Sequence, residues 1–385
     1  MKDEKKAPKL RFKGFTDDWE QCKLSDISEK SYEKNTDNKY STFFTNSAEH
    51  GIVKQRDFFD KDIANSSNIS GYYVVRKNYF VYNPRISNQA KFGPINRNKL
   101  DESGIMSPLY LVFTVHDIDE SFLETLFQTT TWHRFMYQNG DTGARADRFA
   151  IKDSTFMSMP IKVPSLEEQH KLALAFQKLD QTITLHEEKK HQLERLKSAL
   201  LQKMFANKNG YPAVRFEGFD KAWKQSKLGE ITKVIASKPY ISTPSTHGNY
   251  LVIQQGDKPI AGFSNSNPFK NYNNITLFGD HTLSLFKPRS PFLIASDGIK
   301  ILSPSIEMNG LFYFYELEKY KPKSEGYKRH FTILKKCKAN FPTDIDEQKL
   351  IGNLLLRIDN LITKQQLKMD KLNETKESLL QNMFI

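Results

Sequence analysis

The apolar positions of two long segments recur at alternating intervals of four and three residues. In the first segment they are Leu172, Phe176, Leu179, Ile183, Leu193, Leu200 and Met204. In the second they are Ile351, Leu355, Ile358, Ile362, Met369, Leu372, Leu379 and Met383. A sustained 3.5-residue repeat predicts a coiled-coil seam rather than an ordinary amphipathic helix. We therefore expect long helices over 164–208 and 343–385, and we expect them to pair as an antiparallel coiled coil.

Polar residues interrupt both seams at matching places, His186 with Gln365 and Lys197 with Lys376. Polar seam residues lower stability but set the register of a coil. Two other interpretations of these helices stay open, namely arms of ordinary helical hairpins or a coil that dimerises the chain. Neither explains why each helix follows a complete strand-rich segment.

The segments that precede the helices carry strand-like patterns. β-Branched and aromatic residues between Gly, Asn and Pro predict strands over 71–83, 107–115, 250–255, 281–286, 291–296 and 311–317. One further helix is predicted over 119–138, ending at Asn139-Gly140. The fold class is therefore α+β, with a disordered leader at 1–8, one mixed domain at 9–163 and another at 209–342.

The chain contains an internal duplication. Residues 8–27 reappear as 212–231 with ten of twenty positions identical, including Arg11/Arg215 and Trp19/Trp223. From Glu168 and Glu347 onward, thirteen of thirty-eight helix positions are identical at a shift of 179. Between these repeats we find no comparable similarity. A duplicated frame around two unlike inserts predicts a pseudo-two-fold scaffold with two different recognition surfaces.

Composition favours a polyanionic partner. The 385 residues include 57 Lys+Arg and 45 Asp+Glu, a net charge of +12, which suits nucleic acid, although a merely soluble basic protein is also compatible with it. The N-terminal residues lack the apolar core of a signal peptide, and no apolar stretch is long enough to span a membrane. Two unpatterned cysteines, Cys22 and Cys337, fit a reduced, cytoplasmic protein and no metal site.

Polar and basic clusters in the inserts are the candidate DNA contacts. Arg pairs with guanine, and Asn or Gln pairs with adenine, in the major groove. In the first insert the candidates are Arg85, Asn88, Gln89, Lys91, Arg97, Arg145 and Arg148. In the second they are Gln254, Gln255, Asp280, His281, Lys300, Tyr327, Lys328, Arg329 and His330. For each residue alone, a solvated surface side chain is an equally good interpretation; the clusters are the stronger signal.

Signatures of catalysis are mostly missing. Asn83-Pro84-Arg85-Ile86 lacks the second proline and the aromatic residue of the amino-methyltransferase motif. No GxxxxGK[ST] phosphate loop occurs. His186 and His191 stand five residues apart on a helix, so they face different directions and do not share a metal. The sequence predicts neither a catalytic nor a metal site.

The doubled frame resembles the specificity subunit of type I restriction–modification systems. The residues that carry the resemblance are Arg11–Trp19, Glu168-Gln169 and Leu200–Phe205, repeated as Arg215–Trp223, Glu347-Gln348 and Leu379–Phe384. Short stretches at 82–86, 107–113, 279–282 and 326–331 also look like target-recognition domains of that family. One departure is residues 341–348, which lack the second proline of 159–169; we expect a different approach to the second helix there.

The resemblance implies a non-catalytic DNA-binding subunit. Each insert would be a target-recognition domain that reads one half of a bipartite double-stranded site, and the helices would fix the spacing. Two modification subunits would use S-adenosylmethionine for adenine-N6 methylation, and restriction subunits would use ATP and Mg²⁺; this chain would bind no cofactor. A stand-alone DNA methyltransferase or nuclease, or a coiled-coil structural adaptor, remains the alternative.

Overall fold

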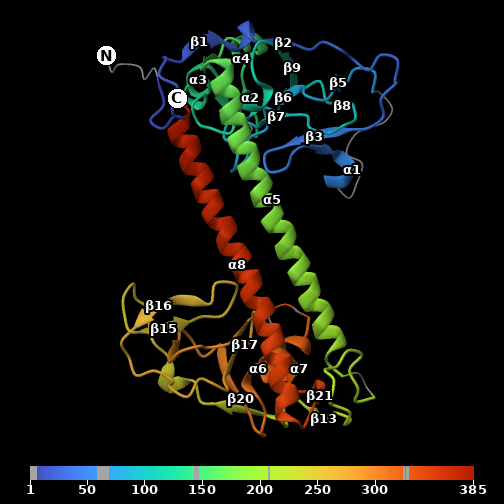
Figure 1. Ribbon diagram of the computed structural model, residues 1–385, viewed down its shortest axis with the longest axis vertical. Coiled ribbons are helices and arrows are strands. Elements are labelled where there is room, and N and C mark those ends of the chain that lie inside the picture. The colour runs from blue at the N-terminus through green and yellow to red at the C-terminus, as the bar shows by residue number, and fades with distance from the viewer. Residues whose placement is uncertain (1–6, 59–68, 143–146, 207–208, 324–325, 327–328) are drawn as a thin grey trace. The chain divides into compact units, whose positions relative to one another are not determined.

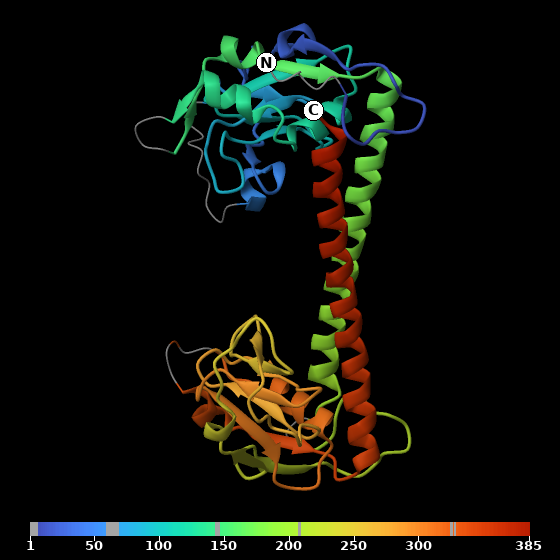
Figure 2. The same ribbon diagram turned by 90° about the vertical axis from the view of Figure 1, so that its left-hand side faces the viewer.

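The computed structural model describes residues 7–58, 69–142, 147–206, 209–323, 326 and 329–385. The chain divides into unit 1, Met1–Leu185 with Met369–Ile385, and unit 2, His186–Lys368. Figures 1 and 2 show the strand-rich part of each unit beside segments of both long helices, α5 (Leu166–Lys203) and α8 (Ile345–Met383). Each unit is therefore completed by a helix segment from the other sequence repeat.

Unit 1 is built on a four-stranded antiparallel sheet. Its order is β2 (Ser28–Lys30), β9 (Leu111–Val115), β6 (Phe80–Tyr82) and β7 (Ile95–Arg97). The unit also contains four antiparallel strand pairs: β1 (Glu20–Lys23) with β12 (Pro160–Val163), β3 (Phe44–Ser47) with β4 (Gly51–Lys54), β5 (Tyr73–Val75) with β8 (Gly104–Met106), and β10 (Asp141–Thr142) with β11 (Phe149–Ala150). Its short helices are η1 (Leu24–Asp26), α1 (Gln55–Phe58), α2 (Glu120–Phe127), α3 (His133–Asn139) and α4 (Asp153–Met157).

Unit 2 repeats the central sheet. Its order is β14 (Thr232–Ile235), β20 (Ile299–Pro304), β17 (Thr276–Gly279) and β18 (Leu285–Phe286), so first, last and middle strands take the same places as in unit 1. The pair β13 (Lys224–Lys227) with β21 (Lys338–Phe341) corresponds to β1 with β12. The remaining elements are a three-stranded sheet, β16 (Ile260–Ser264), β15 (Tyr250–Ile253) and β19 (Phe292–Ile294), with η2 (Lys238–Tyr240), α6 (Gly310–Lys319) and α7 (His330–Leu334). Inserts without sequence similarity thus share one core topology.

The duplicated sequence motif is an ion-pair anchor at the start of each long helix. Arg11 Nε and Nη2 each lie 2.7 Å from a carboxylate oxygen of Glu168, and Arg215 makes the same pair with Glu347 at 2.8 and 2.9 Å. Both glutamates are only 1% exposed, so these pairs are shielded from solvent screening. The anchor ties the N-terminal segment of each unit to its own long helix.

The glutamine that follows each glutamate positions a short helix. Gln169 Oε1 accepts from the Asp119 backbone N–H at 2.9 Å, and Gln348 Oε1 accepts from Asn309 at 2.7 Å. Asp119 and Asn309 are themselves the N-caps of α2 and α6, each accepting two backbone N–H groups of the first turn. Helices α2 and α6 are therefore equivalent elements, held in place by the Glu-Gln pair of the frame.

Each unit also takes up the helix end of the other repeat. Phe384 at the end of α8 stacks on Phe122 of α2 at 5.6 Å and lies edge-on to Trp19 at 6.1 Å. In unit 2, Phe205 stacks on Phe312 at 5.4 Å and lies edge-on to Trp223 at 6.2 Å. The two triplets occupy matching positions of the duplicated sequence. The Met-Phe pair at the end of α8 thus belongs to the core of unit 1, and the Met-Phe pair after α5 belongs to the core of unit 2.

Every predicted seam side chain is buried or half-buried. In unit 1, Lys376 Nζ lies 2.6 Å from Asp180 Oδ1; in unit 2, Lys197 Nζ lies 2.8 Å from Asp359 Oδ1. These ion pairs match at the shift of 179. His186 Nδ1 donates to Gln365 Oε1 at 2.6 Å, and Gln365 is the residue equivalent to His186 in the second repeat. Because partner numbers rise on one helix as they fall on the other, the paired segments are antiparallel within each unit.

Two predicted elements are wrong. The expected helix over 119–138 is interrupted between α2 and α3, because Thr129 bonds Leu126 O and Thr131 through its hydroxyl, which competes with helix continuation. The expected strand over 311–317 is helix α6. An apolar aromatic run is compatible with a buried helix as well as a strand, and the Asn309 cap selects the helix. Gly352 lets α8 approach α6 closely, since a Cβ there would lie 2.9 Å from the Leu311 side chain.

The approach to α8 differs less than we expected. Gln348 Nε2 donates to Pro342 O at 2.7 Å, as Gln169 Nε2 donates to Pro164 O at 2.8 Å, so Pro342 replaces Pro164. Strand register places Lys338 where unit 1 has Pro160, which is the proline that is lost. One extra residue after Pro342 is accommodated before the cap of α8, where Asp344 Oδ1 accepts from Asp346 and Glu347 N–H groups.

Candidate nucleic-acid interface

In unit 1, two predicted arginines meet beyond the end of β6. Arg85 and Arg148 form an isolated antiparallel bridge, flanked by backbone hydrogen bonds from Phe149 N to Pro84 O and from Ile86 N to Asp147 O. Both arginines are exposed and both line a cavity of about 230 Å³. The backbone thus presents two guanidinium groups side by side on the surface, an arrangement suited to phosphate or guanine.

The loop between β6 and β7 carries three more predicted contacts. Asn88, Gln89 and Lys91 are all exposed, on a tight turn closed by reciprocal backbone bonds between Ser87 and Ala90. The turn follows directly on Arg85, so these side chains extend the polar surface that begins at the arginine pair. Arg145 lies outside the described residues.

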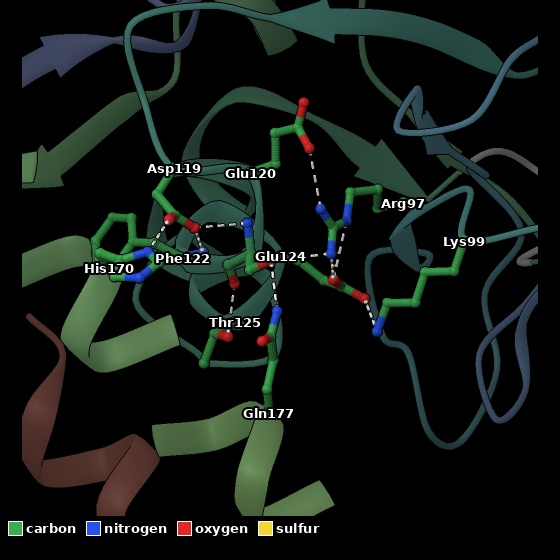
Figure 3. A network of polar contacts seen from close by, with 10 residues as sticks. Arg97, Lys99, Asp119, Glu120, Phe122, Glu124, Thr125, His170 and Gln177 are labelled. Atoms are coloured by element: carbon green, nitrogen blue, oxygen red, sulfur yellow. Dashed lines mark hydrogen bonds and ion pairs between the residues drawn. The ribbon is translucent and has the colours of Figure 1, made fainter. Parts of the chain in front are cut away.

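Arg97 is held inside unit 1 by acidic side chains. Figure 3 shows its guanidinium facing α2, where it lies 3.1 Å from Glu120 and 2.9 Å from Glu124, with a third bond to the Ser121 hydroxyl. Its side chain is only 11% exposed. The structure therefore does not bring Arg97 together with Arg85 and Arg148. Instead, Arg97 links strand β7 to helix α2.

In unit 2, Asp280 joins two segments that are distant in sequence. Asp280 is 3% exposed; its Oδ1 accepts from Phe331 N at 2.9 Å, and its carbonyl accepts from both the backbone N–H and Nδ1 of His330 at 3.0 Å. His330 is fully buried. Asp280 and His330 are thus buried beneath the surface. Their hydrogen bonds fix the position of the exposed Arg329, which directly precedes α7.

Three half-buried members of this cluster, Gln255, His281 and Lys300, lie near Asp280. Lys300 Nζ lies 4.0 Å from Asp280 Oδ2 and donates to Asp297 O at 3.1 Å. His281 is half-buried, and its backbone N–H donates to Gln255 Oε1 at 3.3 Å. Gln254 is exposed but its Nε2 donates to Lys258 O. The structure therefore brings Gln255, Asp280, His281, Lys300, Arg329 and His330 together, with Gln254 at the margin; Tyr327 and Lys328 lie outside the described residues.

The two clusters occupy equivalent places. Arg85 follows the end of β6, and His281 follows the end of β17, which is the same strand of the repeated sheet. Arg148 precedes α4 and Arg329 precedes α7, which again correspond. One strand end of the scaffold thus carries a polar surface in both units, with arginines in unit 1 and an Asp-His-Lys-Arg set in unit 2.

Sequence reasoning missed the residues that line the unit 1 cavity beside the arginines. They include Phe43, Gln55, Tyr72, Asn83 and Tyr110. They come from five separate stretches between residues 43 and 110, so no local pattern groups them. Only the Tyr-Asn-Pro-Arg run next to β6 gave a local signal.

Among the described residues, no group of three or more His, Cys, Asp or Glu side chains is arranged to hold a metal ion. Within the same ranges, no helix combines the length and apolar character that crossing a membrane requires.

Comparison with known proteins adds a family and a fold. Residues 16–195 match the family described as the type I restriction modification DNA specificity domain. The type I restriction–modification S subunit from M. genitalium superposes with a TM-score of 0.63 at 13% identity, covering 98% of this chain and 99% of that one. A structure described as the basis of complex assembly and conformational transition of the type I system gives 0.50 at 17% identity, covering 94% and 96%. No curated protein sequence matches the chain.

Proposed function

Because residues 16–195 match the family described as the type I restriction modification DNA specificity domain, we propose that the whole chain is a specificity subunit that reads a bipartite DNA site. One observation carries the proposal: the same strand end bears a polar, partly basic surface in both units, while the side chains differ. The core fold is the same in both units, but the polar side chains at the strand end differ. This arrangement suits the recognition of two half-sites of different sequence. Side chains that reach base edges supply sequence preference, and arginines on phosphates supply affinity.

The chain acts in this proposal without chemistry of its own. Two modification subunits dock on the duplicated frame and supply adenine-N6 methylation with S-adenosylmethionine, and restriction subunits supply ATP- and Mg²⁺-dependent cleavage, in the cytoplasm where the DNA lies. The duplication itself supports two equivalent docking positions, because each unit offers the same anchor and the same helix ends.

The long helices form an antiparallel coiled coil that fixes the distance between half-sites. The buried seam and the matching pairs Lys376–Asp180 and Lys197–Asp359 support this part of the proposal. A heptad inserted after Glu188 and another after Ile362 would keep the pairs Asp180–Lys376, His186–Gln365 and Lys197–Asp359. Seven helical residues add roughly 10 Å, which equals about three base pairs, so the recognised spacer should lengthen by about three. An unchanged spacer would reject the coil as the ruler.

Genome-wide mapping of N6-methyladenine tests the function directly. The chain is expressed with its cognate modification subunit in a methylation-free host, and each is expressed alone as a control. We expect one split motif that is methylated only when both are present. Methylation by this chain alone would make it an enzyme, and no DNA binding by the assembled complex would favour a structural adaptor.

A further inference from the structure

The cavity beside Arg85 and Arg148 is lined by both aromatic and amide side chains. Phe43, Tyr72 and Tyr110 supply the rings, and Gln55 and Asn83 supply the amides. Its volume is about 230 Å³. Pockets of roughly 300–1,000 Å³ bury drug-sized ligands, so this cavity suits a smaller planar group of the size of one nucleobase.

The walls of the cavity are fixed by contacts that do not involve a ligand. Phe43 and Tyr72 pack edge to face with ring centroids 5.7 Å apart. Asn83 is 6% exposed; its Nδ2 donates to Asn46 O at 2.9 Å and its Oδ1 accepts from Arg85 N at 3.0 Å. A preformed cavity loses little conformational entropy when it is filled.

The arginine pair stands at the edge of this cavity. Since Arg85 and Arg148 are bridge partners, their side chains leave the backbone from neighbouring points. No ion pair within 4.0 Å joins either guanidinium to a carboxylate of the described residues. Two adjacent guanidinium groups next to an aromatic hollow match a nucleotide, with its phosphate on the arginines and its base inside.

We propose that this cavity binds a single unstacked nucleotide of the half-site read by unit 1. The inference rests on the proposed function and goes beyond it, because reading a stacked base pair in the major groove needs protruding side chains and no cavity. An extruded base instead needs a pocket that offers aromatic surface and hydrogen bonds to its edge. Here Tyr72 and Tyr110 offer the surface, and Gln55 and Asn83 lie where a base edge would be.

The equivalent place in unit 2 is filled. The Gln255 side chain packs between two glycines at the strand ends, since a Cβ built on either Gly279 or Gly298 would lie 2.8 Å from it. Unit 2 is therefore the internal comparison for the experiment, because the Gln255 side chain occupies this space between the strand ends.

The test uses the chain in complex with its modification subunit and duplexes that carry the mapped motif. At each position of the two half-sites, one nucleotide is made abasic, first on one strand and then on the other. Where a base enters the cavity, removing the opposite base pre-breaks the pair and should tighten binding, on the order of tenfold. Removing the base that enters the cavity should give no such gain in affinity. Comparing abasic sites on the two strands therefore identifies which strand supplies the nucleotide.

Two variants separate the cavity from general DNA affinity. Tyr110→Leu removes a ring, and Arg148→Gln removes a charge at the edge; each should abolish the gain at that one position in the unit 1 half-site. The matched controls, Tyr137→Leu and Arg134→Gln, change exposed side chains of α3 and should keep it. At the methylated adenine of each half-site the modification subunit itself extrudes the base, so a gain there is expected in every variant and does not count. At the other positions of the unit 1 half-site, a gain that persists in both cavity variants, or no gain at all, would overturn the proposal. Since the mapped motif is required beforehand, either failure leaves the proposed function standing, whereas absence of a motif would remove the function itself.

Discussion

At the start of α5 and at the start of α8 the same three residue types, Arg, Glu and Trp, lie together, yet one contact differs. Arg11 holds Glu168 as Arg215 holds Glu347, but the Trp223 indole N–H also donates to Glu347 at 3.2 Å. In unit 1 the Trp19 indole nitrogen is buried and has no hydrogen-bond partner among the described residues. The frame is thus kept in both units, but unit 2 satisfies a buried donor that unit 1 leaves unpaired.

The strand ends differ far more than the anchors. Unit 1 exposes an arginine pair beside an aromatic cavity, whereas unit 2 places the half-buried His281 and Lys300 and the exposed Arg329 around the buried Asp280. This contrast teaches that the anchor contacts constrain the scaffold while the loops at one strand end vary freely. Removing an anchor should therefore affect a whole unit, and changing a loop should affect only what that unit reads.

The largest effect is expected from the anchor glutamates. Glu347→Ala leaves Arg215 without its partner and removes the acceptor of Trp223, so it should destabilise unit 2 by about 3–5 kcal/mol. Glu168→Ala should cost unit 1 about 1–2 kcal/mol less, because no indole bond is lost there. Hydrogen exchange of amides in α2 and α6 follows each unit separately. Equal losses of protection would contradict the role assigned to the indole bond.

A smaller effect of opposite sign is expected at Glu316. Counted from the caps of α6 and α2, Glu316 stands where unit 1 has Leu126. Glu316 is fully buried and its two carboxylate oxygens lack partners among the described residues. Burial raises its pKa well above the ordinary value. The variant Glu316→Leu should stabilise unit 2 by about 1–3 kcal/mol at neutral pH.

The sign of the pH dependence follows from that raised pKa. The folded state binds the Glu316 proton more tightly than the unfolded state, so this group favours folding most below its unfolded pKa of about 4.3. Its contribution is lost as pH rises through the folded pKa. Urea unfolding of wild type and Glu316→Leu between pH 4 and 8 should show a stability difference that grows with pH; a constant difference would refute the assignment.

The smallest effect is expected at the helix lysines. Lys197 is 16% exposed and binds both Glu318 and Asp359, whereas Lys376 binds Asp180. Burial lowers the pKa of Lys197, but the two carboxylates outweigh it and the pKa is raised, so its stabilisation is lost only in strong alkali, above about pH 10.4. Lys197→Met should cost about 1–2 kcal/mol and Lys376→Met less than about 1. Thermal unfolding measures both, and a larger loss at Lys376 would be inconsistent with these contacts.

The repeat could be predicted from sequence because it is carried by identical residues at constant shifts. Arg11, Trp19, Glu168 and Phe205 recur, and the structure gives each one the same contact in both units. The sequence predicts a strand where the structure has α6, because aromatic residues favour strands locally. The contacts that select the helix, its Asn309 cap held by Gln348 and its packing against Gly352, depend on the tertiary structure. Arg97 was chosen by composition alone, and the acids that hold it lie on α2, more than twenty residues away.

The cavity could not be predicted, because its lining joins segments that only folding brings together. Gln55, Tyr72 and Tyr110 are ordinary surface residues by pattern, and their relation to Arg85 depends on how β3, β6 and β9 are placed. Asp280 and His330 are both among the contacts predicted from the sequence, and the structure brings them together in buried positions, where they hold neighbouring residues in place.

The central claim is that the two units read separate halves of one site. It is tested most directly by N6-methyladenine mapping with wild type, Gln89→Ala and Lys300→Gln, each expressed with the modification subunit. The account predicts that Gln89→Ala relaxes the bases of one half only, that Lys300→Gln relaxes the other half only, and that the spacer is unchanged in both. A change in both halves from either variant, or a motif without two separable halves, would contradict it.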